Sequence, residues 1–479
     1  MKKHNLKINV LLQIMYQVII LVIPLITAPY LTRHLGDNGL GNYTFSYTIA
    51  YYFVLLGMLG INKYGQRLIS TNTSDEFNLR KNFWSLYLAH FIFSIFSLFL
   101  YEILILFIGK EYYKLYLIQS IYVFSAVFDI TWLFYGLENF KSIVIRNAFL
   151  KIIECLMIFL LVKNENDLWI YTLITSLSVF FGQLVMIPVA IKYIKPIFIT
   201  WKDIFKHVKP LLTFSIMVLA SLLYSVFDKT LLGILSTKED VAYYEYANKI
   251  VNVPKTIAIV IGTVIYPRAC KKINDNNFND LEIYYKISLI FTYFIAFASI
   301  SGLLALGDEF AVLYYGQNFS KCGSIMKFMS PIILLITIDN IFQNLYIVPM
   351  GEEKKLNKAI VLGAIINLFL STILIIFLSV NGVILGTLIS EGVLLVLNYI
   401  ICRKKISIKN TFILMIPFVV SGIIMYFLII ILKRKMTLSY LNFFGLVLIA
   451  GFVYFVCIIS YFLLLDKDRN YYKNIIKKG

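Results

Sequence analysis

Charged side chains inside otherwise apolar segments are the residues of this chain best suited to chemistry. They carry both signs and are spread along the sequence: Asp129, Lys151, Glu154, Asp228, Lys229, Lys249, Lys255, Asp339 and Glu391. A charge near the centre of a bilayer costs at least about 2.5 kcal/mol, so it usually faces a partner or a water-filled cavity and marks a substrate or ion pathway. Internal pairing is the alternative for each residue, as for Lys151 and Glu154 at i,i+3.

Polar residues at helical spacing favour the cavity. Four apolar segments carry such a stripe. It consists of Gln13, Gln17, Pro24 and Thr27 in the first, Glu245, Lys249, Asn252, Thr256 and Thr263 with Lys255 beside them in the second, Thr337, Asn340 and Asn344 with Asp339 and Gln343 adjacent in the third, and Thr387, Glu391 and Asn398 in the fourth. Residues three, four or seven apart share one face of a helix. A bundle that only had to pack would not need polar faces on several helices, so we expect a water-accessible cavity at its centre.

The elements that position these residues are about fourteen hydrophobic segments. A helix crosses roughly 30 Å of hydrocarbon with about 20 residues. In lipid a helix satisfies its own backbone, whereas a barrel would need alternating segments of about ten residues. With 60% hydrophobic and 15% charged residues, the chain is predicted to be an all-α polytopic membrane protein. The expected spans are 10–32, 41–62, 83–108, 115–136, 142–162, 169–191, 210–233, 243–267, 284–306, 325–348, 357–379, 382–402, 411–432 and 440–464.

Two positions need separate mention. Segment 243–267 is polar for a helix in lipid, and the division between 357–379 and 382–402 depends on the Asn381-Gly382 turn signal. No cleavable signal peptide is evident before Pro29, because the first apolar stretch is too long and lacks a small-residue cleavage site.

The net charge of +18 is distributed in a way that indicates a membrane rather than nucleic acid. If the N-terminus is cytoplasmic, thirty of the 44 Lys and Arg residues lie in the inner loops and tails, against ten on the outer side. This bias is the positive-inside rule. With fourteen spans, both termini are expected in the cytoplasm.

A faint internal repeat predicts how the spans are grouped. Residues 31–49 and 228–250 align through Leu35-Gly36 and Leu232-Gly233, at an offset of about 200 residues and six spans. Parallel repeats of this kind occur in transporters, where the substrate path runs between the two halves. The last two spans lie outside the two-by-six pattern.

Catalytic and cofactor motifs are missing from the sequence. There is no GxxxxGK[ST], HExxH or GxSxG motif, and His4, His34, His90 and His207 have no metal ligand at a useful spacing. None of the five cysteines forms a CxxC pair. The loops are too short for a folded domain. We therefore expect no catalytic residues, no metal and no cofactor, and a protein that is not an enzyme.

Several blocks, in order along nearly the whole chain, carry a family resemblance. They are PLITAPYLTRHLGDNGLGNYTF (24–45), YYFVLLGMLGINKYGQR (51–67), FDITWLFYGLENFKSIVIRN (128–147), FDKTLLG (227–233), VAYYEYANKIV (241–251), YPR (266–268), GQNF (316–319) and PMGEEKK (349–355). Together they resemble the O-antigen and capsule repeat-unit flippases, the Wzx-like branch of the multidrug/oligosaccharidyl-lipid/polysaccharide exporter superfamily.

The resemblance implies a fold and an activity. It implies an N-terminal lobe of six helices (1–205), a C-terminal lobe of six (206–405) around a central cavity, and two further helices with a cytoplasmic tail (406–479). It also implies that undecaprenyl-pyrophosphate-linked oligosaccharide moves from the inner to the outer leaflet of the bacterial cytoplasmic membrane by alternating access. Membrane lipids, a polymerase and other polysaccharide-assembly proteins would be its partners, and nucleic acid would not.

The same resemblance assigns roles to the residues above. Arg and Lys are the usual partners of phosphate, so the pyrophosphate candidates are Arg33, Lys229, Lys249 and Lys255. The sugar candidates are Tyr43, Tyr47, Asn252, Thr256, Asn340 and Asn344. The candidates for coupling transport to protons or sodium are Asp129, Asp228, Asp339 and Glu391.

Three alternatives remain open at this point. Two belong to the same superfamily, a lipid II flippase and a multidrug exporter, although a drug exporter would be expected to have a more acidic cavity. The third is a membrane polysaccharide polymerase or ligase, which the short outer loops argue against.

Overall fold

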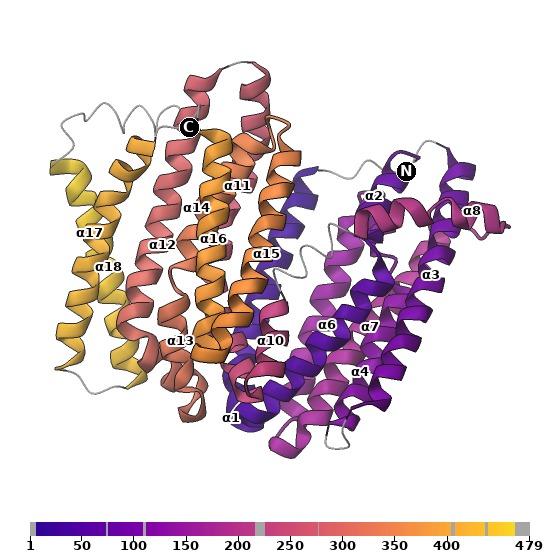
Figure 1. The fold of residues 1–479 in the computed structure, drawn as a ribbon, viewed down its shortest axis with the longest axis horizontal. Coiled ribbons are helices and arrows are strands. Elements are labelled where there is room, and N and C mark those ends of the chain that lie inside the picture. Colours follow the sequence, from indigo (N-terminus) through magenta and orange to yellow (C-terminus); the bar gives the residue numbers. More distant parts are fainter. Residues whose placement is uncertain are drawn as a thin grey trace. The chain divides into compact units, whose positions relative to one another are not determined.

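The computed structural model describes residues 6–72, 75–108, 112–215, 226–275, 277–403, 408–435 and 439–464. All regular elements of these residues are helices, as the sequence predicts (Figure 1). By contacts between Cα atoms the chain divides into two compact units, Met1–Ala242 and Tyr243–Gly479. The lobe boundaries expected near 205 and 405 stay predictions. The expected cytoplasmic tail after 464 lies outside the described residues.

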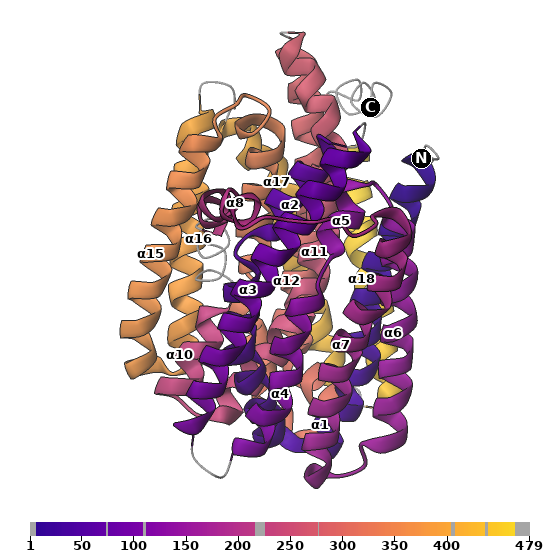
Figure 2. The same ribbon diagram turned by 90° about the vertical axis from the view of Figure 1, so that its right-hand side faces the viewer.

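The first unit contains α1 (Leu6–Met58), α2 (Ile61–Ser70), α3 (Glu76–Leu106), α4 (Tyr113–Ser125), η1 (Ala126–Phe128), α5 (Thr131–Gly136), α6 (Phe140–Leu161), η2 (Glu165–Asp167), α7 (Leu168–Tyr193), α8 (Trp201–Phe205) and α10 (Phe227–Leu235). Residues 208–215 are also helical. In Figure 2 the long helices α3, α4, α6 and α7 run alongside one another, and α1 contacts α3, α4, α6, α7 and α10. The helix α1 therefore links most elements of this unit.

The second unit contains most of α11 (Lys238–Asn274), then α12 (Phe278–Tyr315), η3 (Gln317–Phe319), α13 (Lys321–Met329), α14 (Ile332–Phe342), the π-helix η4 (Gln343–Ile347), α15 (Glu353–Leu378), α16 (Val380–Cys402), α17 (Ile408–Lys433) and α18 (Tyr440–Leu464). Its core joins α12, α14, α17 and α18 through residues such as Tyr285, Phe342, Phe418 and Tyr454. The helix α16 packs on both α14 and α15.

Ten helices of the described residues are long and apolar enough to cross a membrane, and up to eleven if the bent pair Gln317–Met329 and Ile332–Ile347 is one span. This number is smaller than the expected fourteen spans for identifiable reasons. Helix α1 counts once although Gly36 breaks it (φ 67°, ψ 177°), and α6 is not among the ten because it carries Arg146, Lys151 and Glu154. Expected span 210–233 includes 216–225, which lie outside the described residues. The count of fourteen stays a prediction.

The turn between α15 and α16 falls two residues before the Asn381-Gly382 signal. Ser379 takes a positive φ of 49° and interrupts the helix there. Gly382 lies inside α16, where a Cβ atom would collide with the carbonyl of Leu374 on α15. The glycine therefore permits close packing of α15 and α16. The Asn381-Gly382 pair reflects this close packing and not the position of the turn.

Candidate functional site

A ladder of tyrosines follows one face of α1 in the first unit. Tyr43, Tyr47 and Tyr51 are four residues apart, so they project from the same side of the helix. Their ring centroids stack at 6.0 Å for Tyr43–Tyr47 and 6.3 Å for Tyr47–Tyr51. Tyr171 of α7 lies 4.4 Å from the Tyr43 ring, and Tyr122 of α4 stacks on Tyr47 at 4.9 Å. The Tyr47 hydroxyl also donates to that of Tyr122 at 3.2 Å.

Charges of both signs act on this tyrosine ladder. Lys229 interacts electrostatically with Tyr47 and Tyr51, and Glu154 does so with Tyr43 and Tyr47. The buried carboxylate of Glu154 accepts two hydrogen bonds of 2.8 Å from the Lys151 ammonium. The internal pair that the sequence suggested for Lys151 and Glu154 is confirmed, and it neutralises the carboxylate at the edge of the aromatic cluster.

Close packing of α10 on α1 places Lys229 near the tyrosines. The Tyr52 hydroxyl and Thr230 Oγ1 are 2.9 Å apart, which joins the two helices next to Lys229. Gly233 allows the approach, because a Cβ atom there would overlap the ring of Phe45 on α1. Asp228 is buried at the start of α10 and interacts electrostatically with Tyr52. A polar helix segment is thus held against an aromatic one.

In the second unit, the polar face expected on α11 is present. The Lys249 ammonium is 4.0 Å from Glu245 Oε1 and 4.0 Å from the ring centroid of Tyr246. Lys255 is half-buried further along α11, and the carboxylate of Glu391 on α16 interacts with it electrostatically. The two lysines of this helix therefore have acidic neighbours of different origin: one is on the same helix, and the other is on α16.

A buried carboxylate, Asp339 of α14, receives two amide hydrogen bonds. Asn398 Nδ2 of α16 donates to its Oδ1 at 2.7 Å, and Gln343 Nε2 donates to its Oδ2 at 2.5 Å. Gln343 begins the π-helix η4. Such π segments are rare and frequently occur at functional sites. Asp339 is therefore a carboxylate held in the interior by neutral donors rather than by an ammonium group.

The next polar residues of α14 and η4 meet α11. Asn344 Nδ2 donates to Asn340 Oδ1 at 2.9 Å, and both amides are half-buried. Gly262 of α11 packs directly on them, because a Cβ atom there would lie 2.5 Å from Asn340 Oδ1 and 3.2 Å from Asn344 Nδ2. Asn340 and Asn344 are thus brought together as the stripe predicts, beside α11.

Two candidates have surroundings that the sequence did not suggest. Arg33 is exposed and precedes the break at Gly36. Asp129 Oδ1 accepts from the Thr131 backbone N–H at 2.9 Å and from its hydroxyl at 2.5 Å, so it forms a local turn at the start of α5. Asn252 and Thr256 are half-buried on α11. The binding and coupling roles of all these residues stay predictions.

The sequence analysis missed several partners. Tyr51 could have been found, because it continues the four-residue spacing of Tyr43 and Tyr47. Tyr122 and Tyr171 come from α4 and α7, and nothing in their local sequence links them to α1. Asn367 was also missed: its Oδ1 accepts from Ser371, and its Nδ2 donates to Thr387 Oγ1 of α16 at 3.3 Å.

The helical architecture, with ten helices of the described residues long and apolar enough to cross a membrane, is that of a multi-pass membrane protein. The fold is similar to that of a solved lipid II flippase, MurJ in an inward closed conformation, with a TM-score of 0.77, 17% identity and coverage of 96% of this chain and 99% of that one. It is also similar to an inward-facing multidrug resistance MATE family transporter of the MOP superfamily (TM-score 0.59, 14% identity, 81% and 94% coverage). At these identities the likeness establishes the fold.

Sequence comparison identifies the family. Residues 6–273 match the family described as polysaccharide biosynthesis protein, which is more than half of the chain, and the chain belongs to this family. A Shigella dysenteriae protein named for O-antigen transport is 29% identical over 292 residues, 60% of this chain and 72% of the relative. A second protein with that name, from Escherichia coli K12, is 22% identical over 374 residues, 77% and 89% of the two chains. The family resemblance seen in the sequence is confirmed.

Proposed function

We propose that the protein moves undecaprenyl-pyrophosphate-linked oligosaccharide repeat units from the inner to the outer leaflet of the bacterial cytoplasmic membrane. They would supply a surface polysaccharide, O-antigen or capsule. The observation that carries the proposal is the aromatic ladder of α1 with Lys229 beside it, in a chain of the polysaccharide biosynthesis family. Aromatic faces suit the apolar faces of sugar rings, and an ammonium group suits a phosphate.

The binding residues follow from this chemistry. Arg33, Lys229, Lys249 and Lys255 bind the pyrophosphate, and Tyr43, Tyr47, Asn252, Thr256, Asn340 and Asn344 bind the sugars. The amides of Asn340 and Asn344 support a sugar role, because each can both donate and accept hydrogen bonds while their mutual contact uses only one donor and one acceptor. The lipid tail remains in the bilayer throughout.

Ion coupling is assigned to Asp129, Asp228, Asp339 and Glu391, and alternating access of the two lobes moves the substrate. Asp339 has the strongest support, because it is a buried carboxylate bound by two neutral amides. Protonation or cation binding there would change its hydrogen bonds to α16, which offers a route from ion to helix movement. Both termini lie in the cytoplasm in this proposal, and a polymerase receives the flipped unit.

Deletion of the gene in its native host tests the proposal. Lipid-linked repeat units should collect in the inner leaflet, and surface glycan should be lost. Returning the gene with Lys249→Ala and Lys255→Ala together should leave export impaired, whereas Lys358→Ala, an exposed lysine at the start of α15, should restore it fully. Normal export by the double variant would refute the cationic-site assignment while leaving transport itself intact.

The same deletion separates the alternatives. Single repeat units on the outer surface of the deletion strain would contradict flipping and favour a polymerase or ligase. Accumulation of peptidoglycan precursors instead of surface-polysaccharide units would favour a lipid II flippase. Unchanged lipid-linked pools together with increased drug sensitivity would favour a multidrug exporter.

A further inference from the structure

Four large apolar side chains are exposed on one short stretch of the first unit. Phe198, Trp201, Phe205 and Leu212 are 89%, 67%, 66% and 49% exposed. The last three are spaced by four and seven residues, close to whole helical turns. Phe198 precedes α8, Trp201 and Phe205 lie in α8, and Leu212 lies in the helical residues 208–215.

Polar contacts fix this stretch to α3. Asp203 pairs with Lys81 of α3 at 2.8 Å, and the Lys206 ammonium donates to Asn82 Oδ1 at 3.1 Å. Ile204, which lies between Asp203 and Lys206 in the sequence, is buried. The exposed aromatic face is therefore not free to rotate inward, because the hydrogen-bonded face already occupies that position.

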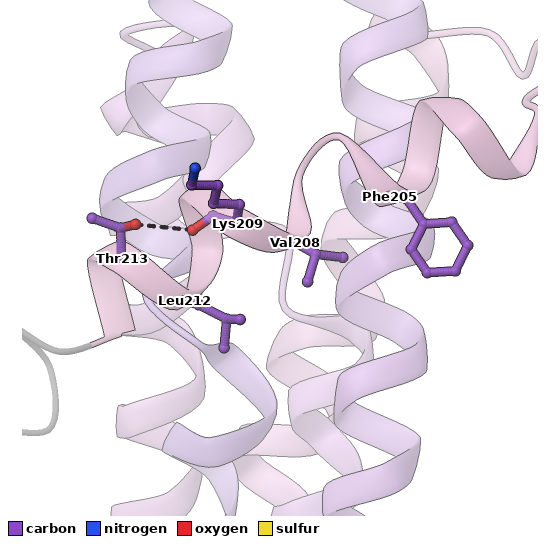
Figure 3. A pocket seen from close by; sticks show the side chains of 5 residues that line it. All are labelled: Phe205, Val208, Lys209, Leu212 and Thr213. Atoms are coloured by element: carbon purple, nitrogen blue, oxygen red, sulfur yellow. Dashed lines mark hydrogen bonds between the residues drawn. The ribbon is translucent and has the colours of Figure 1, made fainter.

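Three exposed lysines alternate with apolar residues of this stretch: Lys202 follows Trp201, Lys206 follows Phe205, and Lys209 follows the half-buried Val208. Phe205, Val208, Lys209, Leu212 and Thr213 line a shallow cavity of about 480 Å³. In Figure 3, the side chains of Val208 and Leu212 point to one side of the segment while the Lys209 amine points to the other. The segment thus has separate apolar and cationic faces next to an open hollow.

The orientation of α8 suits a segment with one apolar and one cationic face. Figure 1 shows α8 lying across the end of α3, close to α2, whereas α3 itself runs along the bundle. The helices α3 and α7 are long and apolar enough to span the membrane, so an element across their ends would lie in the plane of the interface. Amphipathic helices in that plane bury aromatic residues at the boundary with the acyl chains and keep lysines among the head groups.

We propose that residues 198–213 form a binding site for an anionic phospholipid of the leaflet they face. The acyl chain would lie against Phe205, Val208 and Leu212. The phosphate would bind among Lys202, Lys209 and Lys206, whose ammonium keeps two donors besides the one that it gives to Asn82. Basic segments beside membrane spans are attracted to anionic lipid surfaces. The only acidic residue of the segment, Asp203, is already paired with Lys81, so the free face is purely cationic. This site is independent of the flippase proposal.

Fluorescence quenching tests the site in the full-length protein. The protein is placed in nanodiscs of phosphatidylcholine and phosphatidylglycerol, with bromine on the acyl chains of only one lipid at a time at an equal fraction. The emission of Trp201 is obtained as the difference between the wild type and Trp201→Phe. Brominated phosphatidylglycerol should quench this emission more strongly than brominated phosphatidylcholine, and high salt should reduce the preference.

Substitutions identify the lysines as the cause. Each of Lys202→Gln, Lys206→Gln and Lys209→Gln should lower the affinity for the anionic lipid about fivefold, and the triple variant should show equal quenching by both lipids. A triple Arg variant should keep the preference, which guards against a variant that is merely misfolded. Removing the same number of charges from 354–358 should change nothing at Trp201.

Two outcomes would overturn the site. Equal quenching by the two lipids in the wild type would mean ordinary contact with the bilayer and no anionic lipid site. No quenching by either would mean that Trp201 is outside the bilayer, as it would be if a protein covered this face.

Discussion

A buried histidine, His207, joins the α8 segment to α2 and α3, and we expect it to make this junction sensitive to pH. The Tyr64 hydroxyl is 2.8 Å from His207 Nδ1, and the Ser85 hydroxyl is 2.8 Å from its Nε2. A neutral imidazole offers one donor and one acceptor, and each hydroxyl can supply the complement. Protonation would turn both ring nitrogens into donors in an interior position.

The pKa of His207 is lowered from 6.5 to about 4, mainly by burial and also by the adjacent charge of Lys206, while Asp203 acts in the opposite direction. Because the folded state prefers the neutral ring, its stabilising effect is complete above the unfolded pKa near 6.5. It is lost as the pH falls toward 4. A difference of this size corresponds to at most about 3.5 kcal/mol, since one pKa unit is about 1.4 kcal/mol.

Substitution with glutamine separates the hydrogen bonding of His207 from its titration. The amide can donate and accept but does not titrate, so His207→Gln should weaken the junction by about 1–2 kcal/mol at pH 7 through poorer geometry. The penalty should shrink as the pH falls toward 4.5, because the wild type is then losing its own stabilisation. Tyr64→Phe removes one hydrogen bond but leaves the titrating ring, so it should stay pH-sensitive.

Hydrogen exchange of the backbone amides in 200–213, corrected for the intrinsic effect of pH, measures the stability of this junction. Amides in the middle of α3 serve as the internal reference. Wild-type protection in 200–213 that does not change between pH 7 and 4.5 would refute the reasoning. A parallel loss in His207→Gln would also refute it, since the titrating group would then be a different one.

Two further predictions concern stability, measured as the thermal unfolding of the protein in nanodiscs. Gly386→Ala should destabilise the protein by about 1–3 kcal/mol, because the added Cβ atom would collide with Ser371 of α15. Gly392→Ala in the same helix is the control, since its Cβ atom would meet open space and the variant should be neutral or slightly stabilised. Equal effects of the two substitutions would mean that α15 and α16 can move apart freely. Lys151→Met should lower the free energy of unfolding by about 3 kcal/mol, because the buried Glu154 carboxylate would lose its ammonium partner. Adding Glu154→Met should recover most of this lost stability. No recovery would show that the loss arose from packing rather than charge.

Helical periodicity predicted which polar residues share a face but not what they contact. The spacing of Glu245 and Lys249 places both on one side of α11, and the structure has their charged atoms 4.0 Å apart. Lys255 lies on the same helix, yet the charge that acts on it comes from Glu391, far along the chain. A helix in lipid fixes its own geometry through backbone hydrogen bonds, whereas its neighbours depend on the packing of the whole unit.

The repeat around Leu35-Gly36 and Leu232-Gly233 shows that the sequence likewise does not predict why each glycine is needed. Gly36 has a left-handed φ of 67° and breaks α1. Gly233 remains helical, and its missing side chain makes room for Phe45 instead. The chain turns only after α10 ends at Leu235. Identical residues at aligned positions thus meet different requirements, one of the backbone and one of packing, which sequence spacing does not distinguish.

The four acidic candidates for ion coupling look alike in the sequence, since each is a carboxylate in an apolar segment. In the structure, one oxygen of Asp129 accepts hydrogen bonds from the backbone N–H and the hydroxyl of Thr131 in a local turn before α5. Asp339 instead spans two elements through Asn398 and Gln343. A change of charge at Asp129 acts first on a local turn. At Asp339 it acts on the packing of α14 against α16. An ion bound there would therefore bias the position of a whole helix, which is what the proposed ion coupling requires.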